Sequence, residues 1–308
     1  MTNRLKQQEN NLIFDDNLKY SIDREPLVSI ITVVLNSEKY IDKTINSVLN
    51  QTYKNCEYII IDGGSTDRTI EIIKKYEDKI DYSISEIDSG IYDAMNKGIC
   101  LAHGHIIGIL NSGDFYANDT VEKVINTYNL NKRQNDFGLV VIGAMYRFSE
   151  NEKVRFKQNS NKFDSCGPIV INHPATFVTC SVYNNIGSFN LKYRISADYD
   201  FILRAYHDEK IHFIFIDDAL TNMLMGGFSE KFSTIFTRLK ERFHIRGKYI
   251  NVSENINNSC YWLLRKFIYH LLSSIIGYQI FIIKILFTCQ INKLRKKYFF
   301  YKIRNNEK

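Results

Sequence analysis

The chain has 308 residues, 44% of them hydrophobic, so it can bury one large α/β core and carry an appendage. Residues 261–308 contain ten Lys or Arg against one acid, a balance of +9. Because the whole chain carries +6, the first 260 residues carry −3. The cysteines form no C-x-x-C pair and the histidines no H-E-x-x-H pattern, which argues against a zinc site.

The N-terminal extension, residues 1–26, is polar and charged. It lacks the apolar core that a signal peptide needs, so we expect the protein to stay in the cytoplasm.

The next segment predicts a strand, helix, strand unit. The run Val28–Leu35 is short, apolar and β-branched, and Asn36 ends it. Apolar residues then recur at helical spacing over 40–49, and Tyr58–Ile61 predicts a second buried strand that stops at Asp62. Ligands of open sheets lie beyond the carboxyl ends of the strands, so Asn36 and Asp62 should face one crevice that suits a nucleotide.

Further along, residues 70–76 predict a helix, with Ser65 or Thr66 available as its cap. Residues 86–98 then place three acids, an amide and a lysine in thirteen positions. A third buried strand, Ile106–Leu110, runs directly into Asn111-Ser112-Gly113-Asp114. An acid just past a buried strand is a natural ligand for a hard cation, although Asp114 could instead cap a helix over 118–124.

In their order, these motifs resemble the family 2 glycosyltransferases of the GT-A fold, in particular bacterial enzymes that build surface polysaccharides. The resemblance runs from about Val28 to about Ser229. It implies an α/β fold for residues 27–250, in which a Rossmann-like, nucleotide-binding mixed sheet is flanked by helices.

The resemblance also implies which residues bind the nucleotide-sugar donor. Asn36 would lie near the nucleotide, and Asp62 would accept a hydrogen bond from a uracil-type base. The segment SEIDSGIYDAMNKG implies donor contacts from Asp88, Asn96 and Lys97. The expected donor site consists of Val33, Asn36, Asp62, Asp88, Asn96, Lys97, Asn111 and Ser112.

The metal motif departs from the family pattern. Most members carry a DxD-type motif whose carboxylates hold a divalent cation against the donor diphosphate, whereas only Asp114 remains here, next to Gly113. One carboxylate with diphosphate oxygens and waters can still hold Mg²⁺. We therefore expect Asp114 to bind Mg²⁺ or Mn²⁺.

The second half is expected to supply the acceptor side. The family usually opens a helix with an acidic pair; here Ala197 replaces the first acid and Asp198 keeps the second. We expect Asp198 to be the general base and Asp200 a supporting residue, since Arg204 lies four positions on, at the spacing of a helical salt bridge. His173 either contacts donor or acceptor, or is a turn residue before Pro174.

Residues 251–308 predict a basic, apolar helical tail, in which FIYHLLSSIIGYQIFII is only marginal as a membrane span. We expect interfacial helices on the inner leaflet of the cell membrane, with Lys293, Arg295, Lys296 and Lys297 against anionic head groups. The alternative is a hairpin that packs on the catalytic domain or between subunits. The basic amphipathic helix predicted over 235–249 could hold an acceptor's lipid diphosphate or form a solvated face.

The resemblance implies inverting transfer of a sugar, most simply from a UDP-sugar, to a hydroxyl of a glycan or lipid-linked glycan. The alternative is a non-catalytic nucleotide-sugar-binding or scaffold descendant, because Gly113 and Ala197 replace two acids. A nicotinamide-dependent Rossmann enzyme is excluded, since L-N-S-E-K-Y stands where G-x-G-x-x-G would follow the first strand. Nucleic acid is not an expected partner, because the basic residues of the tail flank apolar helices and do not interleave with a stacking platform.

Overall fold

The computed structural model describes residues 25–131, 138–150, 155–159, 172–227 and 232–249. The chain divides into two compact units, Met1–Ile245 and Arg246–Lys308. The predicted tail, 251–308, and all but the last two residues of the N-terminal extension lie outside the described residues. Within the described part of the chain, no helix combines the length and apolarity that crossing a membrane requires.

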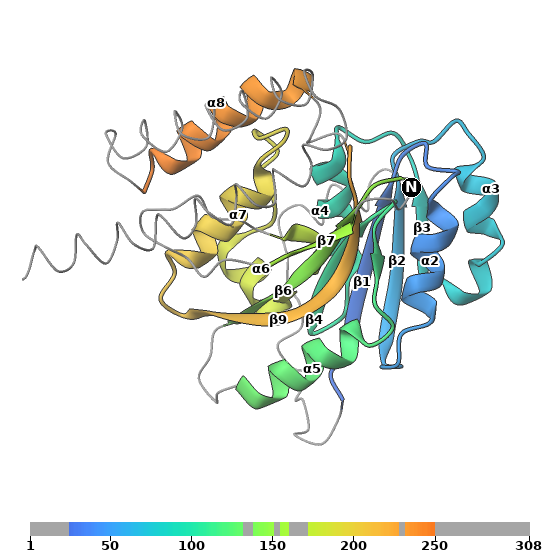
Figure 1. Cartoon of the computed structure of the whole chain (residues 1–308), viewed down its shortest axis with the longest axis horizontal. Coiled ribbons are helices and arrows are strands. Elements are labelled where there is room, and N and C mark those ends of the chain that lie inside the picture. Colours follow the sequence, from blue (N-terminus) through green and yellow to red (C-terminus); the bar gives the residue numbers. More distant parts are fainter. Residues whose placement is uncertain (1–24, 132–137, 151–154, 160–171, 228–231, 250–308) are drawn as a thin grey trace, which may run out of the picture. The chain divides into compact units, whose positions relative to one another are not determined.

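The described strands form a nine-stranded mixed sheet (Figure 1). One half is parallel and contains, in spatial order, β3 (Tyr82–Ser85), β2 (Cys56–Asp62), β1 (Val28–Val34) and β4 (Ile106–Asn111). The other half continues with β8 (Thr176–Thr179), β6 (Gly138–Phe148), β9 (Ile211–Leu224) and β5 (Phe115–Tyr116). β8 runs antiparallel to β4 and β6, and β7 (Arg155–Gln158) pairs with the end of β6. The expected mixed sheet is confirmed.

The described helices lie around this sheet (Figure 1). They are α2 (Ile41–Leu49), α3 (Thr69–Lys74), α4 (Ile91–Leu101), α5 (Thr120–Asn131), α6 (Cys180–Ile186), α7 (Ala197–Tyr206) and α8 (Ile235–Arg246). Three short 3₁₀ turns, η1 (Glu77–Lys79), η2 (His173–Ala175) and η4 (Phe232–Thr234), complete the described elements.

The parallel strands are apolar along their length because both faces of the sheet are covered. Every residue of β1 is buried. On one face Ile30 joins a core with Ile45 of α2 and Val124 of α5. On the other face α4 lies directly against Ile31: a Cβ at Gly98 would stand 2.4 Å from the Ile31 Cγ2 atom. Gly98, the last residue of the MNKG motif, therefore permits the close approach of α4 to β1.

Most of the elements predicted in the first half of the chain are confirmed, with shifted ends. The three predicted strands correspond to β1, β2 and β4, and the two predicted helices to α2 and α3. The expected cap of α3 is wrong, because the Thr69 backbone N–H donates to the Asp67 carboxylate at 3.0 Å, and neither Ser65 nor Thr66 caps the helix.

Two features were not anticipated. The segment Ile91–Leu101 forms a helix that the sequence did not predict. Asp114 does not cap a helix, since α5 begins six positions later and the Asp114 Oδ1 atom accepts the Leu224 N–H at 3.0 Å. This bond attaches the loop after β4 to the end of β9.

Candidate active site

The strand register places three of the predicted donor residues, Val33, Asp62 and Asn111, at the carboxyl ends of neighbouring strands. Val34 is paired with Asp62 of β2, and Val33 with Asn111 of β4. The polar ends of β2 and β4 therefore flank the end of β1, as the sequence predicted. Val33 itself is buried, and its carbonyl accepts the Ser112 N–H at 3.0 Å.

Asn36 connects the loops that follow β1 and β2. It has a left-handed backbone, with φ of 47°, a conformation that asparagine adopts more readily than most residues. Its backbone N–H donates to the Ser65 hydroxyl at 2.7 Å, and its Oδ1 accepts the Thr66 N–H at 2.8 Å. Asn36 thus joins the loop after β1 to the loop after β2.

The Asp62 carboxylate is buried and already hydrogen-bonded. It accepts the backbone N–H groups of Gly64 at 3.1 Å and Ser65 at 2.9 Å, the Ser65 hydroxyl, and the Ser85 hydroxyl at 2.7 Å. These bonds shape the turn after β2. A base contact from Asp62 would use the remaining acceptor capacity of its two oxygens.

Asp88 lies against the same turn, because a Cβ at Gly63 would stand 2.3 Å from the Asp88 Oδ2 atom. The Asp88 Oδ1 atom accepts the Gly90 N–H at 2.9 Å, just before α4 begins. Lys97 forms ion pairs with Glu86 at 2.8 Å and Asp93 at 3.4 Å.

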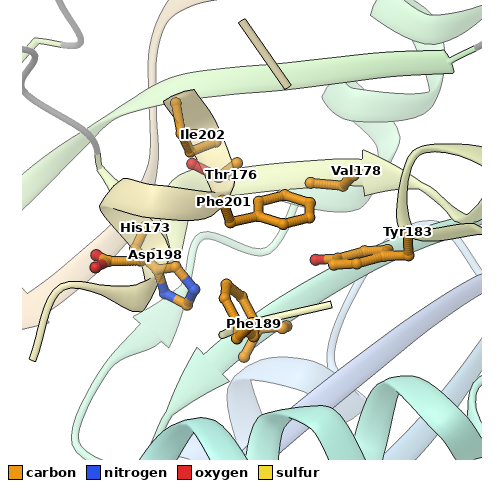
Figure 2. Close-up of a pocket in the computed structure, with 9 residues that line it drawn as sticks. His173, Thr176, Val178, Tyr183, Phe189, Asp198, Phe201 and Ile202 are labelled. Atoms are coloured by element: carbon orange, nitrogen blue, oxygen red, sulfur yellow. The ribbon is translucent and has the colours of Figure 1, made fainter. Parts of the chain in front are cut away.

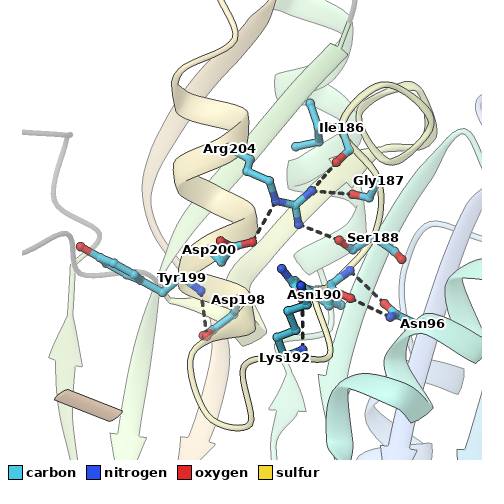
Figure 3. A network of polar contacts seen from close by, with 11 residues as sticks. Asn96, Ile186, Gly187, Ser188, Asn190, Lys192, Asp198, Tyr199, Asp200 and Arg204 are labelled. Atoms are coloured by element: carbon cyan, nitrogen blue, oxygen red, sulfur yellow. Dashed lines mark hydrogen bonds and ion pairs between the residues drawn. The ribbon is translucent and has the colours of Figure 1, made fainter. Parts of the chain in front are cut away.

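Asn96 holds the chain segment before α7. Its Nδ2 donates to the Phe189 carbonyl at 2.9 Å, and its Oδ1 accepts the Phe189 N–H at 3.0 Å (Figure 3). Both ends of the amide are thus used within the protein. The donor contacts of Asp88, Asn96 and Lys97 stay predictions.

The segment Asn111–Asp114 offers oxygen ligands at the end of β4. The Asn111 Oδ1 atom is buried and has no hydrogen-bond partner among the described residues. The Ser112 hydroxyl donates to the Ser37 hydroxyl at 2.7 Å, which joins this loop to the one after β1. Asp114 is 5% exposed, and the described residues contain no group of three His, Cys, Asp or Glu suited to a metal. Any cation here would need further oxygens from its substrate.

Asp198 is in the first turn of α7 and is held through one oxygen. Its Oδ1 accepts the Tyr92 hydroxyl at 2.9 Å and the Tyr199 N–H at 2.8 Å. No hydrogen bond reaches Oδ2 from any residue that the structure describes. The side chain borders a small, largely apolar cavity that is also lined by Val178 of β8 and Phe201 of α7 (Figure 2).

His173 lines this cavity together with Asp198, and Figure 2 shows the two side chains next to each other. The His173 ring packs against Phe189, with ring centroids 5.8 Å apart. Burial lowers the pKa of His173, and the charge of Asp198 opposes this shift. A lowered pKa favours the neutral imidazole beside the predicted base. His173 also stands in the turn η2, so its contact with donor or acceptor stays a prediction.

Asp200 faces the other way and has a structural partner. It is fully buried, and its Oδ2 accepts the Arg204 Nε–H at 2.9 Å. The Arg204 guanidinium also donates to the carbonyls of Ile186, Gly187 and Ser188, which end α6 and begin the next loop (Figure 3). The predicted helical salt bridge is confirmed. The further hydrogen bonds of Arg204 attach α7 to the end of α6.

The fold places most of the predicted residues in two groups, which do not include Val33, Asn96 and Lys97. The strand-end group contains Asn36, Asp62, Asp88, Asn111, Ser112 and Asp114, and the helical group contains His173, Asp198 and Asp200. The sequence does not predict the contact of Tyr92 with Asp198. Tyr92 stands within the motif quoted for donor binding, but nothing in the sequence indicates that it reaches Asp198, 106 positions away.

Comparison with known proteins agrees with this arrangement. The model of "Glycosyl transferase family 2" matches residues 29–219 of the chain. An uncharacterised glycosyltransferase of Mycobacterium tuberculosis (strain ATCC 25618 / H37Rv) is 33% identical over 189 residues, which are 58% of this chain and 69% of the relative.

Two solved structures share the fold. S. aureus TarS 1–349 in complex with UDP-GlcNAc aligns with a TM-score of 0.56 and 18% identity over 77% of this chain and 71% of that one. The mannosyltransferase PcManGT from Pyrobaculum calidifontis, solved with GDP-Man and Mn²⁺, aligns with a TM-score of 0.56 and 15% identity over 73% of this chain and 64% of that one. The family match and the relatives make the chain a glycosyltransferase, a member of glycosyl transferase family 2.

Proposed function

We propose that this glycosyltransferase moves a sugar, with inversion, from a UDP-sugar to a hydroxyl of a glycan or lipid-linked glycan, with Asp198 as the general base. The observation that carries the proposal is the way in which Asp198 is held. Two groups donate hydrogen bonds to Oδ1, and Oδ2 accepts no hydrogen bond from the described residues. A carboxylate fixed through one oxygen presents the other to an acceptor hydroxyl.

The base removes the proton of the acceptor hydroxyl as that oxygen attacks the anomeric carbon of the donor sugar. The reaction requires the carboxylate to approach the hydroxyl within about 3 Å. Because the neighbouring His173 is neutral, it forms no ion pair that would offset the negative charge of Asp198. Transfer in a single displacement places the two substrates on opposite sides of the anomeric carbon, which inverts its configuration.

The strand-end group is proposed to bind the nucleotide and diphosphate of the donor. The turn Asp62–Ser65 is joined to Asn36 through the Ser65 hydroxyl, and Ser112 is joined to the loop after β1. TarS has been solved with UDP-GlcNAc, which supports a UDP-sugar as the donor here. PcManGT has been solved with GDP-Man, so the uracil preference rests on Asp62.

The oxygen ligands that the loop after β4 offers suit Mg²⁺ or Mn²⁺. Asn111 offers a buried amide oxygen with no described hydrogen-bond partner, and Asp114 offers a buried carboxylate. These two residues would hold the cation, with diphosphate oxygens and waters as the remaining ligands. When bound, the cation would stabilise the negative charge that develops on the departing nucleoside diphosphate.

A thermal-shift screen tests donor and metal together. We expect UDP-sugars to raise the melting temperature more in the presence of Mg²⁺ or Mn²⁺ than with a chelator, because a ligand that binds only the folded state stabilises it. GDP- and CMP-sugars serve as nucleotide controls. Equal shifts with every nucleotide would contradict the uracil preference, and equal shifts with chelator would contradict the metal.

If Asp198 is the base, Asp198→Asn should abolish the release of UDP from the donor in the presence of acceptor. The donor-induced thermal shift should stay nearly unchanged. The substitution keeps the shape of the side chain but removes its ability to accept a full proton. Asp119→Asn, an exposed acid of the turn before α5, is the control. Undiminished turnover in Asp198→Asn would overturn the assignment, and absence of turnover in the wild type with every donor would favour the non-catalytic alternative.

A further inference from the structure

The peptide of Ile195, three positions before Asp198, is held on both sides by helices distant in sequence. Its carbonyl accepts the Tyr92 hydroxyl of α4 at 2.9 Å. Its N–H donates to Glu241 of α8 at 3.0 Å, and the preceding N–H, of Arg194, donates to the other oxygen of Glu241 at 2.7 Å. The loop that delivers Asp198 is thus fixed by one phenol and one carboxylate.

Tyr92 also reaches the predicted base directly. Its hydroxyl lies 2.9 Å from both the Ile195 carbonyl and the Asp198 Oδ1 atom, so a single proton serves two acceptors that lie side by side. The side chain is 8% exposed and packs on Phe189, with ring centroids 5.5 Å apart. Burial, followed by the charge of Asp198, holds the pKa of Tyr92 well above its ordinary value. The phenol therefore stays protonated and remains a donor.

Two contacts fix the position of α4, the helix that carries Tyr92. The helix packs against β1 at Gly98, where no larger residue fits without displacement. One turn after Tyr92 on the same helix, Asn96 makes two hydrogen bonds to the Phe189 backbone. The same helix thus holds both the Phe189 segment and the residues that lead into α7.

We propose that Tyr92 is a positioning residue for Asp198, and that Glu241 supports it by fixing the loop from the opposite side. The inference rests on the proposed function, since it concerns the residue assigned there as the base. Tyr92 orients Oδ1 and thereby leaves Oδ2 directed to the acceptor. Neither residue needs to touch a substrate to affect the rate.

The decisive comparison is between Tyr92→Phe and Tyr183→Phe. Both substitutions remove one hydroxyl from a buried ring that packs on Phe189. Only Tyr92 bonds Asp198, whereas the Tyr183 ring stacks on Phe201, with centroids 4.8 Å apart. We expect Tyr92→Phe to lower kcat about tenfold or more, the effect of losing a hydrogen bond to a charged group, and to leave KM for donor and acceptor within about twofold. Tyr183→Phe should change neither constant.

Glu241 gives a second, independent variant. Glu241→Ala removes both acceptors of the loop and should lower kcat, whereas Glu241→Gln keeps one acceptor oxygen and should restore part of the loss. Thermal melting of each variant, measured in parallel, identifies a rate loss that only reflects unfolding. Equal kcat in Tyr92→Phe and Tyr183→Phe would overturn the role of Tyr92, and no rescue by Glu241→Gln would overturn that of Glu241.

Failure of the inference is distinguishable from failure of the proposed function. If wild type turns over and Asp198→Asn does not, but Tyr92→Phe behaves as wild type, then only the positioning role is wrong. If Asp198→Asn retains turnover, the base assignment fails first, and the positioning role falls with it.

Discussion

At the scale of single residues, two aspartates two positions apart on α7 have opposite surroundings. Residues i and i+2 of a helix point to different sides, so Asp198 and Asp200 cannot share a partner. Asp198 borders the cavity, while Asp200 is buried against Arg204. The sequence spacing predicted this division, and the structure confirms the pair between Asp200 and Arg204.

Asp200 is predicted to matter for stability. Asp200→Asn leaves the mostly buried Arg204 guanidinium without its counter-charge, so we expect the free energy of unfolding to fall by about 3–5 kcal/mol. The control is Asp119→Asn, whose partner Lys123 has the same i,i+4 spacing and the same 2.9 Å separation but is exposed to solvent, so a loss of about 0.3–0.5 kcal/mol is expected. Denaturant unfolding measures both, and equal losses would contradict the prediction.

His173 is predicted to make stability depend on pH. Its pKa is lowered in the folded state below the ordinary value of 6.5, so the unfolded chain binds more protons in the interval between the two values. Stability therefore rises with pH there and is lost as pH falls through it. We expect the melting temperature of wild type to drop more steeply than that of His173→Gln between about pH 8 and about pH 5. Parallel curves for the two proteins would show that another group is responsible.

At the scale of elements, the two residues that replace acids of the family pattern, Gly113 and Ala197, occupy positions where a carboxylate would be poorly tolerated. Gly113 has a φ of 100°, a backbone conformation that residues with a Cβ rarely adopt. Ala197 is 0% exposed at the start of α7, so an acid there would be buried. Both replacements thus follow from the local structure of a loop and a helix start, and neither removes Asp114 or Asp198.

The loop after β4 is predicted to require glycine at position 113. The new Cβ of Gly113→Ala meets only ordinary van der Waals contact, with the nearest Leu224 atom 3.6 Å away, so its cost is the backbone strain alone, about 1–2 kcal/mol. Gly227→Ala, with no atom within 4 Å of its Cβ and no left-handed backbone, is the matched control and should cost nothing. Chemical unfolding of both variants gives the comparison, and a neutral Gly113→Ala would contradict the strain.

At the scale of the whole molecule, a sheet that is parallel on one side and mixed on the other brings the two groups of residues onto one catalytic unit. The parallel half ends at the residues proposed to bind the nucleotide, and β8, antiparallel to β4, leads into α6 and then α7. The tail that follows carries the basic excess of the chain. We propose that this tail binds the inner leaflet of the cell membrane and brings the catalytic unit to lipid-linked acceptors.

The tail is predicted to bind anionic lipid. The full chain should sediment with vesicles that contain phosphatidylglycerol and release from them at high salt, because the attraction is screened within a Debye length. Neutral phosphatidylcholine vesicles are the control. A variant with glutamine at Lys293, Arg295, Lys296 and Lys297 should bind more weakly. Equal sedimentation of the variant and wild type would contradict an electrostatic contact by these residues.

The sequence by itself determined the buried strands, the strand ends and the charged first turn of α7, because these features follow from local periodicity and from the ends of apolar runs. It did not predict the helix α4, because the acids, amide and lysine of that segment are typical of ligands. Only the tertiary structure decided which side chains meet: Asn96 bonds Phe189 across 93 positions, and Tyr92 bonds Asp198 across 106. Such contacts depend on how closely α4 packs on the sheet, and a one-dimensional pattern carries no information on that distance.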